Sequence, residues 1–541
     1  MKKAIIGLMA IGGYLLPAQA DIFEVDGIWF EQMTENEVMV VPEPSSSSGS
    51  GTSFDIRNYY EGDIIIPQTV AYQDIEYTVT AVKEGTFSES RKLTSVAIPS
   101  TVLDLGASPF ANCPLLSTIS LSPDNVAYAM VDGLLYDKLI TTLIACPGAY
   151  TQPVTIPSSV NTIAVSAFCG CANLTDISIP QSVTEIGKHS FEGCKGLTEI
   201  HLPLGITAIP DSSFYYCNSL KEMTLPQSVS SIGKRAFYQC SSLSSVILPD
   251  AVEVVDDYAF GLCSGLTTLQ LSGSLKTIGY RAFENCMKLK MVKIPSQVKE
   301  IGILAFVGCS GLTTITVDEE NETFCSLDGV LYDKERKTLR CYPSAKQGIY
   351  TMPGTVTTIG EYGFYSCRFL YSLVLPASVT TIKEGAFRLC SALQRITLPA
   401  TVNSWGENVF VACSGLKAIV YYADTPPEIS ASTFTSGNYN VPLYVLKRAL
   451  DDYKNAPYWS QFATILPIDG TVVDGLLGDV NNDGYINMSD VTVIINYILG
   501  REVNDFRWQQ ADMNFDGFIN MSDVTGVINF ILGKTTEDTE E

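Results

Sequence analysis

The sequence predicts a β-rich solenoid followed by a small α-helical module. Three observations lead to this prediction. A phenylalanine followed three residues later by a cysteine recurs at a constant step of 23 residues along most of the chain. In each repeat, apolar and polar residues alternate over a short stretch that ends in proline, as in a short β-strand. Beyond Asp469 this pattern stops, and apolar residues follow one another at helical spacing.

One repeat, read from Val183 to Pro203, shows what each coil of the solenoid requires. Leu197, Ile200 and Leu202 are inward-facing, and Pro203 ends the strand because proline has no amide hydrogen. About five apolar side chains cannot shield one another within a single repeat, so each coil is stable only against its neighbours. Self-similarity at such a period indicates stacked coils joined by short parallel strands. The landmark residues are Phe87, Phe110, Phe168, Phe191, Phe214, Phe237, Phe260, Phe283, Phe306, Phe364, Phe387 and Phe410.

The repeat motif can be written I-P-x-S-V-T-x-I-G-x-x-A-F-x-x-C-x-x-L-x-x-I-x-L-P, and it is nearly complete at 179–203 and 375–399. This pattern resembles the BspA-type leucine-rich repeat, a bacterial class of the leucine-rich repeat family. The resemblance covers residues 85–426, which leaves 21–84 as an N-terminal β cap and 427–468 as a C-terminal cap. It implies a secreted or surface-exposed protein that acts in adhesion or protein binding rather than catalysis.

Two steps between landmark phenylalanines are 58 residues instead of 23, so the repeats contain inserts near 125–150 and 321–346. Both inserts carry the same element, V-D-G-L-L-Y-D-K and L-D-G-V-L-Y-D-K. We expect two β-hairpins that protrude from the solenoid, with turns near Lys138 and Lys334. Protruding loops on a rigid scaffold are frequent recognition sites. Since the resembling family is known for this insertion, a structural role is an equally open alternative.

Charge and composition exclude several function classes. The formal net charge is −24, which argues against nucleic acid or an anionic membrane surface as a partner. The two histidines, His189 and His201, both lie inside repeats, which argues against a histidine-based triad or a catalytic zinc site.

The N-terminal residues 1–20 have the three parts of a secretory signal peptide. Lys2 and Lys3 precede an apolar run, and Ala18-Gln19-Ala20 is a small-residue cleavage site. The apolar run is shorter than the roughly 20 residues that a membrane anchor needs. No other stretch is long enough to be a transmembrane segment. We therefore expect a secreted protein, extracellular or at the cell surface.

Most cysteines share one position in the repeat. A same-position ladder is typical of small buried side chains, and stacked strands would place its Cβ atoms roughly 4.8 Å apart, against the roughly 3.8 Å of a disulfide. We therefore expect free buried thiols. Cys325 and Cys341 flank the second insert, and a disulfide between them is left open. The ladder consists of Cys113, Cys171, Cys194, Cys217, Cys240, Cys263, Cys286, Cys309, Cys367, Cys390 and Cys413.

After a linker at 469–476, two segments fit a twelve-residue calcium loop, 479–490 and 512–523. Calcium prefers several hard oxygen ligands in a flexible cage, and the sharp turn of such a loop needs glycine at position 6. Both segments have these features with the same ligand types, which predicts two Ca²⁺ ions. The expected ligands are Asp479, Asn481, Asp483, Tyr485, Asn487, Asp490, Asp512, Asn514, Asp516, Phe518, Asn520 and Asp523.

Each loop runs into one predicted amphipathic helix that a glycine ends, Gly500 or Gly533. An ordinary EF-hand has a helix before the loop and glutamate at position 12, whereas this sequence has aspartate there and little room for a preceding helix. The apolar faces consist of Val491, Ile494, Ile495, Ile498 and Leu499, and of Val524, Val527, Ile528, Ile531 and Leu532.

This pattern resembles a type I dockerin, a small all-α calcium-binding domain, at 477–533, with an acidic tail at 534–541. The resemblance implies a cohesin-type domain as partner. It also implies that loop positions 10 and 11 bind that partner; they are Met488, Ser489, Met521 and Ser522. The identical pairs favour docking in two orientations, while the alternative is that the second copy only completes the fold.

The outward-facing residues of the strands show neither a row of aromatic side chains nor a cluster of carboxylates, so a paired-acid glycosidase site is not visible and we expect no enzyme. The leading hypothesis is a tethered binding protein whose repeats hold an unknown protein or glycan. The alternative is a non-catalytic glycan-binding component of an extracellular complex that takes part in polysaccharide catabolism. The two outward rows in the central repeats are Ser178, His201, Thr224, Ile247, Gln270, Lys293 and Thr316, and Asp176, Glu199, Glu222, Ser245, Thr268, Met291 and Thr314.

Overall fold

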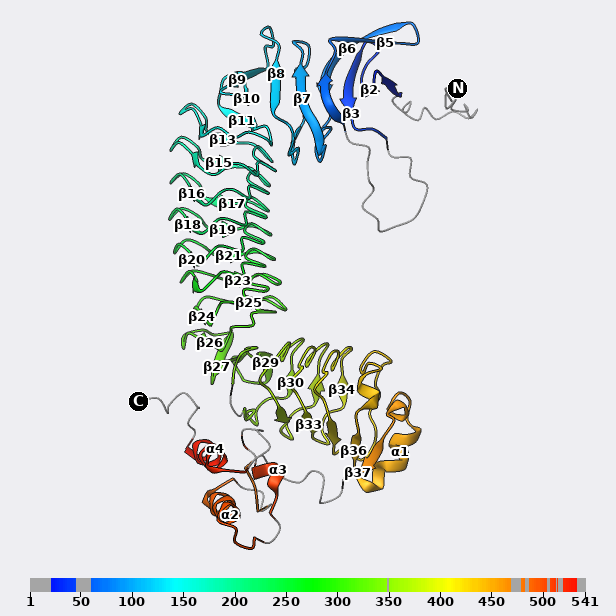
Figure 1. The fold of residues 1–541 in the computed structure, drawn as a ribbon, viewed down its shortest axis with the longest axis vertical. Helices are drawn as coiled ribbons and strands as arrows, with labels where there is room; N and C mark the ends of the chain where they lie inside the picture. Colours follow the sequence, from blue (N-terminus) through cyan, green and yellow to red (C-terminus); the bar gives the residue numbers. More distant parts are fainter. Residues whose placement is uncertain are drawn as a thin grey trace. The chain divides into compact units, whose positions relative to one another are not determined.

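The computed structural model describes residues 21–44, 60–347, 350–468, 478–481, 486–503, 506–511, 513 and 519–532. The chain divides into two compact units, residues 1–206 with 212–218 and residues 207–211 with 219–541. In both units short strands stack in parallel ladders (Figure 1). The predicted signal peptide, the linker and the acidic tail lie outside the described residues.

The first unit begins with a five-stranded sheet in the order β1-β2-β3-β6-β5 (Figure 1, blue). Asp26 and Gly27 have φ values of +53° and +81° and form the tight turn between β1 and β2. Phe30 and Val38 point into a core shared with Phe87 of the first coil, so this sheet covers the open end of the stack. The strands are β1 Ile22–Val25, β2 Ile28–Gln32, β3 Glu37–Val41, β5 Thr69–Tyr72 and β6 Ile75–Val82.

The coils of the first unit form parallel ladders. In the ladder of β13 and β15, Ile163 lies opposite Ile186, the equivalent residue of the next repeat, so one repeat makes one coil. A separate sheet, β4-β7-β8, begins the stack. The strands are β4 Glu61–Ile65, β7 Lys92–Ile98, β8 Thr118–Leu121, β12 Val154–Thr155, β13 Thr162–Ile163, β14 Ile177–Ser178, β15 Glu185–Ile186 and β16 Glu199–His201.

Each insert is a three-stranded antiparallel meander and not the protruding two-stranded hairpin that the sequence predicts. The first consists of β9 (Tyr128–Val131), β10 (Leu134–Asp137) and β11 (Thr142–Ala145). The second consists of β27 (Phe324–Leu327), β28 (Val330–Asp333) and β29 (Thr338–Cys341). The expected turns near Lys138 and Lys334 are present, but the Asp-Gly pairs make an additional turn in each meander.

The middle strand of each meander is buried, which explains why the inserts do not protrude. Leu135 and Tyr136 of β10 are at most 1% exposed, and Leu331 and Tyr332 of β28 are equally buried. The third strand continues the solenoid, because β11 pairs in parallel with β13 and β29 pairs in parallel with β30. Each meander is therefore part of the wall.

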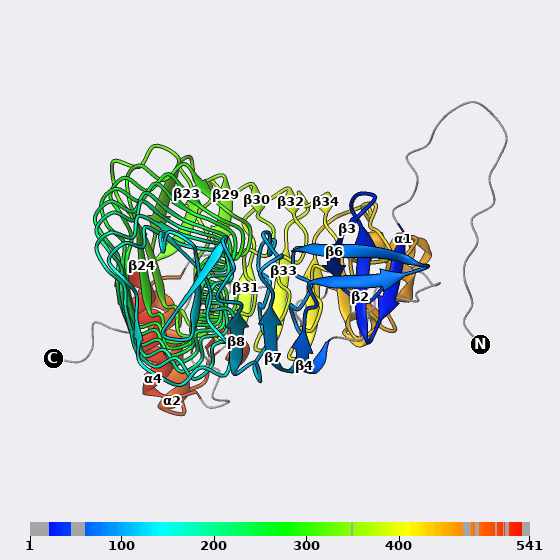
Figure 2. The same cartoon turned by 90° about the horizontal axis from the view of Figure 1, so that it is seen from above.

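The second unit repeats the ladder pattern. Val254 lies opposite Thr277 and Thr381 opposite Ser404, in each case the equivalent residue of the next repeat. Viewed from above, consecutive coils superpose as closely spaced loops (Figure 2, green). The strands are β17 Ala208–Ile209, β18 Glu222–Thr224, β19 Ser231–Ile232, β20 Ser245–Ile247, β21 Val254–Val255, β22 Thr268–Gln270, β23 Thr277–Ile278, β24 Met291–Ile294, β25 Glu300–Ile301, β26 Thr314–Val317, β30 Thr358–Ile359, β31 Ser372–Val374, β32 Thr381–Ile382, β33 Arg395–Leu398, β34 Ser404–Trp405 and β35 Ala418–Tyr421.

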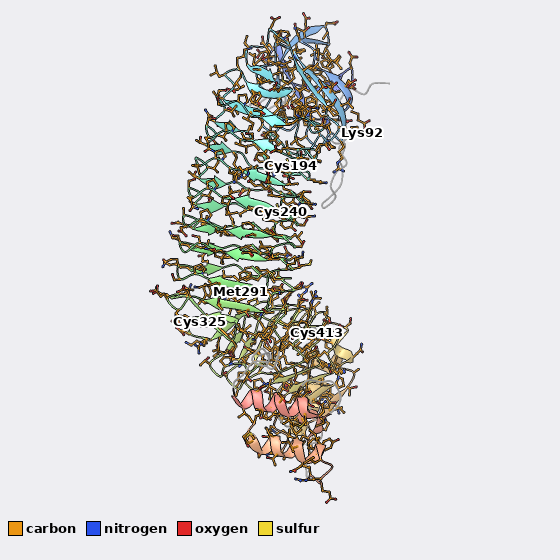
Figure 3. The ribbon with its side chains drawn as sticks, turned by 60° about the vertical axis from the view of Figure 1, so that its left-hand side comes forward. Lys92, Cys194, Cys240, Met291, Cys325 and Cys413 are labelled. Atoms are coloured by element: carbon orange, nitrogen blue, oxygen red, sulfur yellow. The ribbon has the colours of Figure 1, made fainter. Side chains whose placement is uncertain are left out.

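The core of the stack is a column of phenylalanine rings beside a column of cysteines. In the second unit, Phe260 stacks on Phe237 and on Phe283 with ring centroids 5.1 and 5.5 Å apart. Cys240 and Cys413 lie within the stacked coils (Figure 3). Stacked aromatic rings at this distance stabilise each coil against the next.

The C-terminal cap packs around one buried tryptophan. Trp459 is 1% exposed and donates its indole N–H to the carbonyl oxygen of Pro427 at 2.8 Å. Trp459, Tyr453 and Phe434 belong to the core cluster of the last coils, so the cap covers their apolar edge. The elements are β36 Leu443–Val445, β37 Ile465–Pro467, α1 Leu450–Asn455 and the 3₁₀ turns η1 Asn438–Asn440, η2 Lys447–Ala449 and η3 Trp459–Gln461.

The C-terminal module contains the helices α2 (Met488–Ile498), α3 (Trp508–Ala511) and α4 (Met521–Leu532). Its core lies between α2 and α4, which are in contact (Figure 1). Gly500, with φ of +69°, ends α2 as predicted. Leu499 was expected on the apolar face of α2 but lies beyond the helix and is exposed, because the chain has already turned away from the core.

Candidate calcium loops and exposed faces of the repeats

The first candidate calcium loop is closed by the carboxylate of Asp490, its last position. Asp490 Oδ1 accepts hydrogen bonds from the backbone N–H groups of Val480 and Asn481, at 2.8 and 3.1 Å, and Oδ2 accepts one from Asn487 at 3.0 Å. Asp490 is fully buried, and Asp479 at the first position is 2% exposed. The carboxylate at the last position thus holds the backbone at the start of the loop.

The second loop repeats these contacts at the equivalent positions. Asp523 accepts hydrogen bonds from the backbone N–H groups of Met513, at 2.8 Å, and Asn520, at 2.9 Å, and is fully buried. In the first loop the Asn487 side chain accepts from the Ser489 amide, and in the second Asn520 accepts from Ser522, both at 2.8 Å. Position 9 therefore caps a helix in both loops, and the described contacts of the two loops are alike.

The oxygen atoms of these side chains fit a calcium ion. No lysine, arginine or histidine forms an ion pair with Asp490 in the described part of the chain, where its hydrogen-bond donors are backbone amides. A buried carboxylate without a cation is costly, and a bound divalent ion would balance its charge. Asp479, Asn481, Asn487, Asp490, Asn520 and Asp523 are the expected ligands within the described residues. The other expected ligands, Asp483, Tyr485, Asp512, Asn514, Asp516 and Phe518, lie outside them, and the described residues alone contain no group of three or more His, Cys, Asp or Glu able to hold a metal.

The two loops are held together by close packing. Gly478 donates its amide to the carbonyl of Gln510, and Arg507 donates to the carbonyl of Val480. Met513 lies 3.5 Å from the position that a Cβ of Gly478 would take and 2.7 Å from that of Gly526. The start of the second loop is therefore packed between the first loop and α4.

The four residues expected to bind a partner are all exposed at the start of the two helices. Met488 is 58% and Met521 59% exposed, and Ser489 and Ser522 are exposed beside them. Large apolar side chains exposed in equivalent places on a small domain are unusual unless they meet another surface.

A partly exposed row of tyrosine and arginine runs along the second unit, at positions two or three residues before the landmark phenylalanine or directly after it. Arg281 lies over the rings of Tyr258 and Tyr280 at 5.9 and 5.2 Å, and Arg235 lies over Tyr258 at 5.3 Å. The Tyr258 ring is edge-on to Tyr238 and to Tyr280. The outward strand rows hold no such aromatic series, so this row was missed in the sequence. Reading the position before each A-F pair down the repeats finds Arg235, Tyr258 and Arg281, but not Tyr238 and Tyr280, which stand at other repeat positions.

The cysteine column is chemically inert. The cysteines of the chain are thiols and not halves of disulfides, as predicted. The thiol of Cys263 donates to the carbonyl of Phe237 at 3.1 Å, and that of Cys286 donates to Phe260 at 3.3 Å. Burial raises the pKa of Cys263 to about 12, so this thiol stays protonated and unreactive at neutral pH.

Cys325 and Cys341, the one pair left open as a disulfide, are also free thiols. They lie on β27 and β29, and β28 runs between these strands. Two strand spacings amount to roughly 9.6 Å, beyond the Cα separation that a disulfide can bridge. The geometry of the meander therefore excludes this bridge.

The geometry defines a class, a leucine-rich repeat solenoid joined to a paired-loop helical module. BspA-type leucine-rich repeat models match residues 69–130, 148–263, 230–327 and 341–440, which together make up more than half of the chain. The chain belongs to the BspA-type leucine-rich repeat family. A dockerin type I domain matches residues 477–532. Both families are generally non-catalytic.

Solved structures of leucine-rich repeat proteins resemble the chain. One, from Eubacterium ventriosum, is 28% identical over 50% of this chain and 73% of its own, with a TM-score of 0.43. Another, from Bacteroides ovatus, is 24% identical over 83% of this chain and 100% of its own, with a TM-score of 0.42. A leucine-rich cell surface protein from Faecalibacterium prausnitzii is 24% identical over 86% and 97%, with a TM-score of 0.37. No curated protein matches the chain.

Both families typically occur outside the cell or at its surface. Within the described ranges, no helix combines the length and apolarity needed to cross a membrane.

Proposed function

We propose that this protein is a secreted binding protein, whose repeats recognise a ligand in adhesion or protein binding and whose dockerin domain tethers it to a cohesin. The observation that carries the tethering is the closure of both loops by the buried carboxylates Asp490 and Asp523. Two calcium ions, one in each loop, would order the loops and thereby fix the helices that meet the partner. Bound calcium would supply only this ordering; the contacts to the cohesin come from the protein.

The cohesin would meet the exposed ends of α2 and α4. Met488 and Ser489 on one helix and Met521 and Ser522 on the other are equivalent in sequence and exposure. A surface with two equivalent halves can present either half to the same partner. We therefore infer that the domain docks in two orientations, related by exchange of the two loops.

The repeats would supply recognition, because a rigid wall of parallel coils holds exposed side chains at fixed spacing. A second candidate ligand class, a glycan, is favoured by the row of Tyr238, Tyr258 and Tyr280 with Arg235 and Arg281. Aromatic faces next to cations suit the apolar face and the anionic groups of acidic sugars. In this role the protein would be a non-catalytic component of an extracellular complex that degrades polysaccharide.

The test is capture of partners from the envelope and secreted fractions of the producing organism, with the full mature protein as bait. Captures are run in calcium and in a chelator, and an Asp490→Ala, Asp523→Ala double variant serves as the control. We expect a cohesin-bearing partner that is captured only in calcium and lost in the double variant. Capture of that partner in chelator, or by the double variant, contradicts the tethering.

A further inference from the structure

A cavity of about 280 Å³ lies in the second unit, beside the second insert. One side is the coil at 301–307 and the other the coil at 360–365. It opens where the ladder is interrupted, since β25 is the last strand of one sheet and β29 belongs to the next. Its volume is close to the lower end of the roughly 300–1,000 Å³ of ligand pockets. The cavity is therefore large enough for one sugar unit.

The first insert shows what this place looks like when it is closed. The two inserts align position by position, and an equivalent bond recurs: Cys146 donates its amide to Ala167, and Tyr342 donates to Gly363. At Gly148 the coil touches the preceding coil so closely that a Cβ would lie 2.2 Å from the carbonyl oxygen of Cys113. Residue 344, the equivalent of 148, is a serine whose hydroxyl donates to the carbonyl of Cys309 at 2.6 Å. The serine side chain thus occupies a space that the first insert does not have.

The flanking coils also differ between the two inserts. In the first, Ser108 and Ser166 are hydrogen-bonded at 3.0 Å, and the Asn112 amide donates to the carbonyl of Cys169 at 3.0 Å, which joins the coils across the insert. The equivalents of Ser108, Ser166 and Cys169 in the second insert are the bulky residues Leu304, Tyr362 and Tyr365. These side chains line the cavity instead of closing it.

The charged groups of the cavity have no counterpart in the first insert. Arg340, Glu361 and Lys383 line the second site, and the equivalent residues of the first insert are Ile144, Val165 and Gly187. The ring centroids of Tyr362 and Tyr365 are 6.0 Å apart and the ring planes are inclined by 63°, so one wall of the cavity is aromatic. The same backbone hydrogen bond joins the coils at both inserts. The charged residues at the second insert are therefore not required for its fold.

The charge of the cavity suits an anion with one negative charge. Arg340 is exposed and forms no ion pair with a described residue; its guanidinium lies over the Phe324 ring at 5.9 Å. Lys383 Nζ and Glu361 Oε1 are 3.9 Å apart, so this pair is already balanced. The cavity therefore carries one uncompensated positive charge in a chain whose net charge is −24.

We propose that this cavity binds an acidic monosaccharide unit, a hydroxylated ring with a single carboxylate such as a hexuronate. The proposal rests on the proposed role of the repeats as the ligand-binding part, and it names the ligand class. Arg340 pairs with the carboxylate, for which its planar fork of donors is suited. Tyr362 and Tyr365 pack against the ring, and Glu361 accepts hydrogen bonds from its hydroxyls.

The test is a saturation-transfer NMR titration of the full chain with methyl α-D-galacturonide, in chelator so that the dockerin does not contribute. Methyl α-D-galactoside, acetate and a glutamate-containing tetrapeptide are titrated in parallel. The variant Arg340→Ile replaces the arginine by isoleucine, which is the residue at the equivalent position of the first insert. Lys337→Ala removes an exposed cation of the same insert, which pairs with Glu335 outside the cavity.

We expect saturable binding of the galacturonide, weaker by at least about tenfold in Arg340→Ile and unchanged in Lys337→Ala. Binding of the galactoside or acetate should be weaker by a similar factor. No binding of the galacturonide, equal binding of the galactoside, tighter binding of the peptide, or an unaffected Arg340→Ile overturns the proposal. If Arg340→Ile does not fold, as judged by circular dichroism, Arg340→Gln makes the same comparison, because it removes the charge of this exposed side chain and keeps it polar. Calcium-dependent capture of the cohesin-bearing partner is measured on the same preparation. It shows whether the dockerin tether works even when the cavity does not bind the sugar.

Discussion

At the scale of the residue, the cysteine of most coils links its coil to the coil before. The thiol donates to the phenylalanine carbonyl 26 residues earlier, as between Cys390 and Phe364 at 2.8 Å and between Cys413 and Phe387 at 2.9 Å. The Phe387 carbonyl also accepts the backbone N–H of Cys390 at 3.2 Å, so the thiol of Cys413 is its second donor. A hydrogen bond of this kind contributes roughly 0.5–1.5 kcal/mol, and cysteine is small enough for the column to supply it.

Replacement of Cys263 by alanine tests this role. We expect the free energy of unfolding to fall by about 1–2 kcal/mol at pH 7, because a hydrogen bond is lost and a small cavity remains. Urea unfolding measures the loss, and the exposed substitution Thr268→Ala is the control, with an expected change within about 0.5 kcal/mol. An equal effect of both substitutions would contradict the assigned role of the thiol.

The difference between wild type and Cys263→Ala should also depend on pH. The folded pKa of Cys263 is raised from 9.0 to about 12 by burial, so above pH 9 the unfolded state loses a proton that the folded state keeps. The contribution of the thiol is therefore complete below about pH 9 and declines up to about pH 12, by at most about 1.4 kcal/mol per pH unit. Urea unfolding at pH 8 and pH 10.5 should show the wild type losing stability relative to the variant. A difference that does not change with pH would be inconsistent with a buried thiol.

At the scale of the element, the inserts show where sequence reasoning succeeded and where it stopped. The repeated V-D-G-L-L-Y-D-K pattern located both inserts and one of the two turns in each. The burial of Tyr136 and Tyr332 was not visible, because a short run of apolar residues does not reveal whether it packs on a wall or leaves it. The cavity was equally invisible, since it depends on how closely Gly148 and Ser344 approach the preceding coil.

The close contact between Gly148 and the preceding coil can be tested by adding one methyl group. Gly148→Ala would place a Cβ 2.2 Å from the carbonyl oxygen of Cys113, in backbone that cannot move without separating two coils. We expect a loss of at least about 3 kcal/mol in the free energy of unfolding. Gly273→Ala is the matched control, because nothing lies within 4 Å of its Cβ position, and its effect should stay within about 0.5 kcal/mol. Similar midpoints for the two variants in urea would show that the coils are not in close contact at Gly148.

The C-terminal module was predicted further than the inserts, because its loops and helices follow from residue spacing alone. The regular series of oxygen-bearing residues, the glycine at position 6 and the apolar spacing of the helices located both loops and both helices. What spacing could not reveal is that Asp490 and Asp523 close the loops by accepting backbone hydrogen bonds. It also could not reveal that Leu499 lies beyond the end of α2.

At the scale of the whole molecule, the constant repeat period was sufficient to predict the solenoid, because only stacking shields the apolar side chains of one repeat. The exposed faces could not be predicted in the same way. The row of Tyr238, Tyr258 and Tyr280 forms only when successive coils bring residues at different repeat positions together. Such a surface depends on the stack and not on any single repeat.

Docking in two orientations predicts a specific pattern of partner binding. Met488→Asp should abolish one orientation and Met521→Asp the other, because a charge in the contact must be desolvated. Each single variant should therefore keep cohesin binding within about a factor of two, and the double variant should lose it by at least about a hundredfold. Surface plasmon resonance with the captured cohesin measures these affinities. Complete loss in either single variant would leave a single mode of docking.

The measurement that tests the tether most directly is a calorimetric titration of the full chain with calcium, after removal of metal by a chelator and dialysis. Two ions per chain are expected, falling to one in Asp490→Ala and to none in the Asp490→Ala, Asp523→Ala double variant. Met488→Ala, which leaves every ligand in place, should still bind two. Absence of calcium binding by the intact chain, or binding that survives in the double variant, would contradict the calcium-dependent tether.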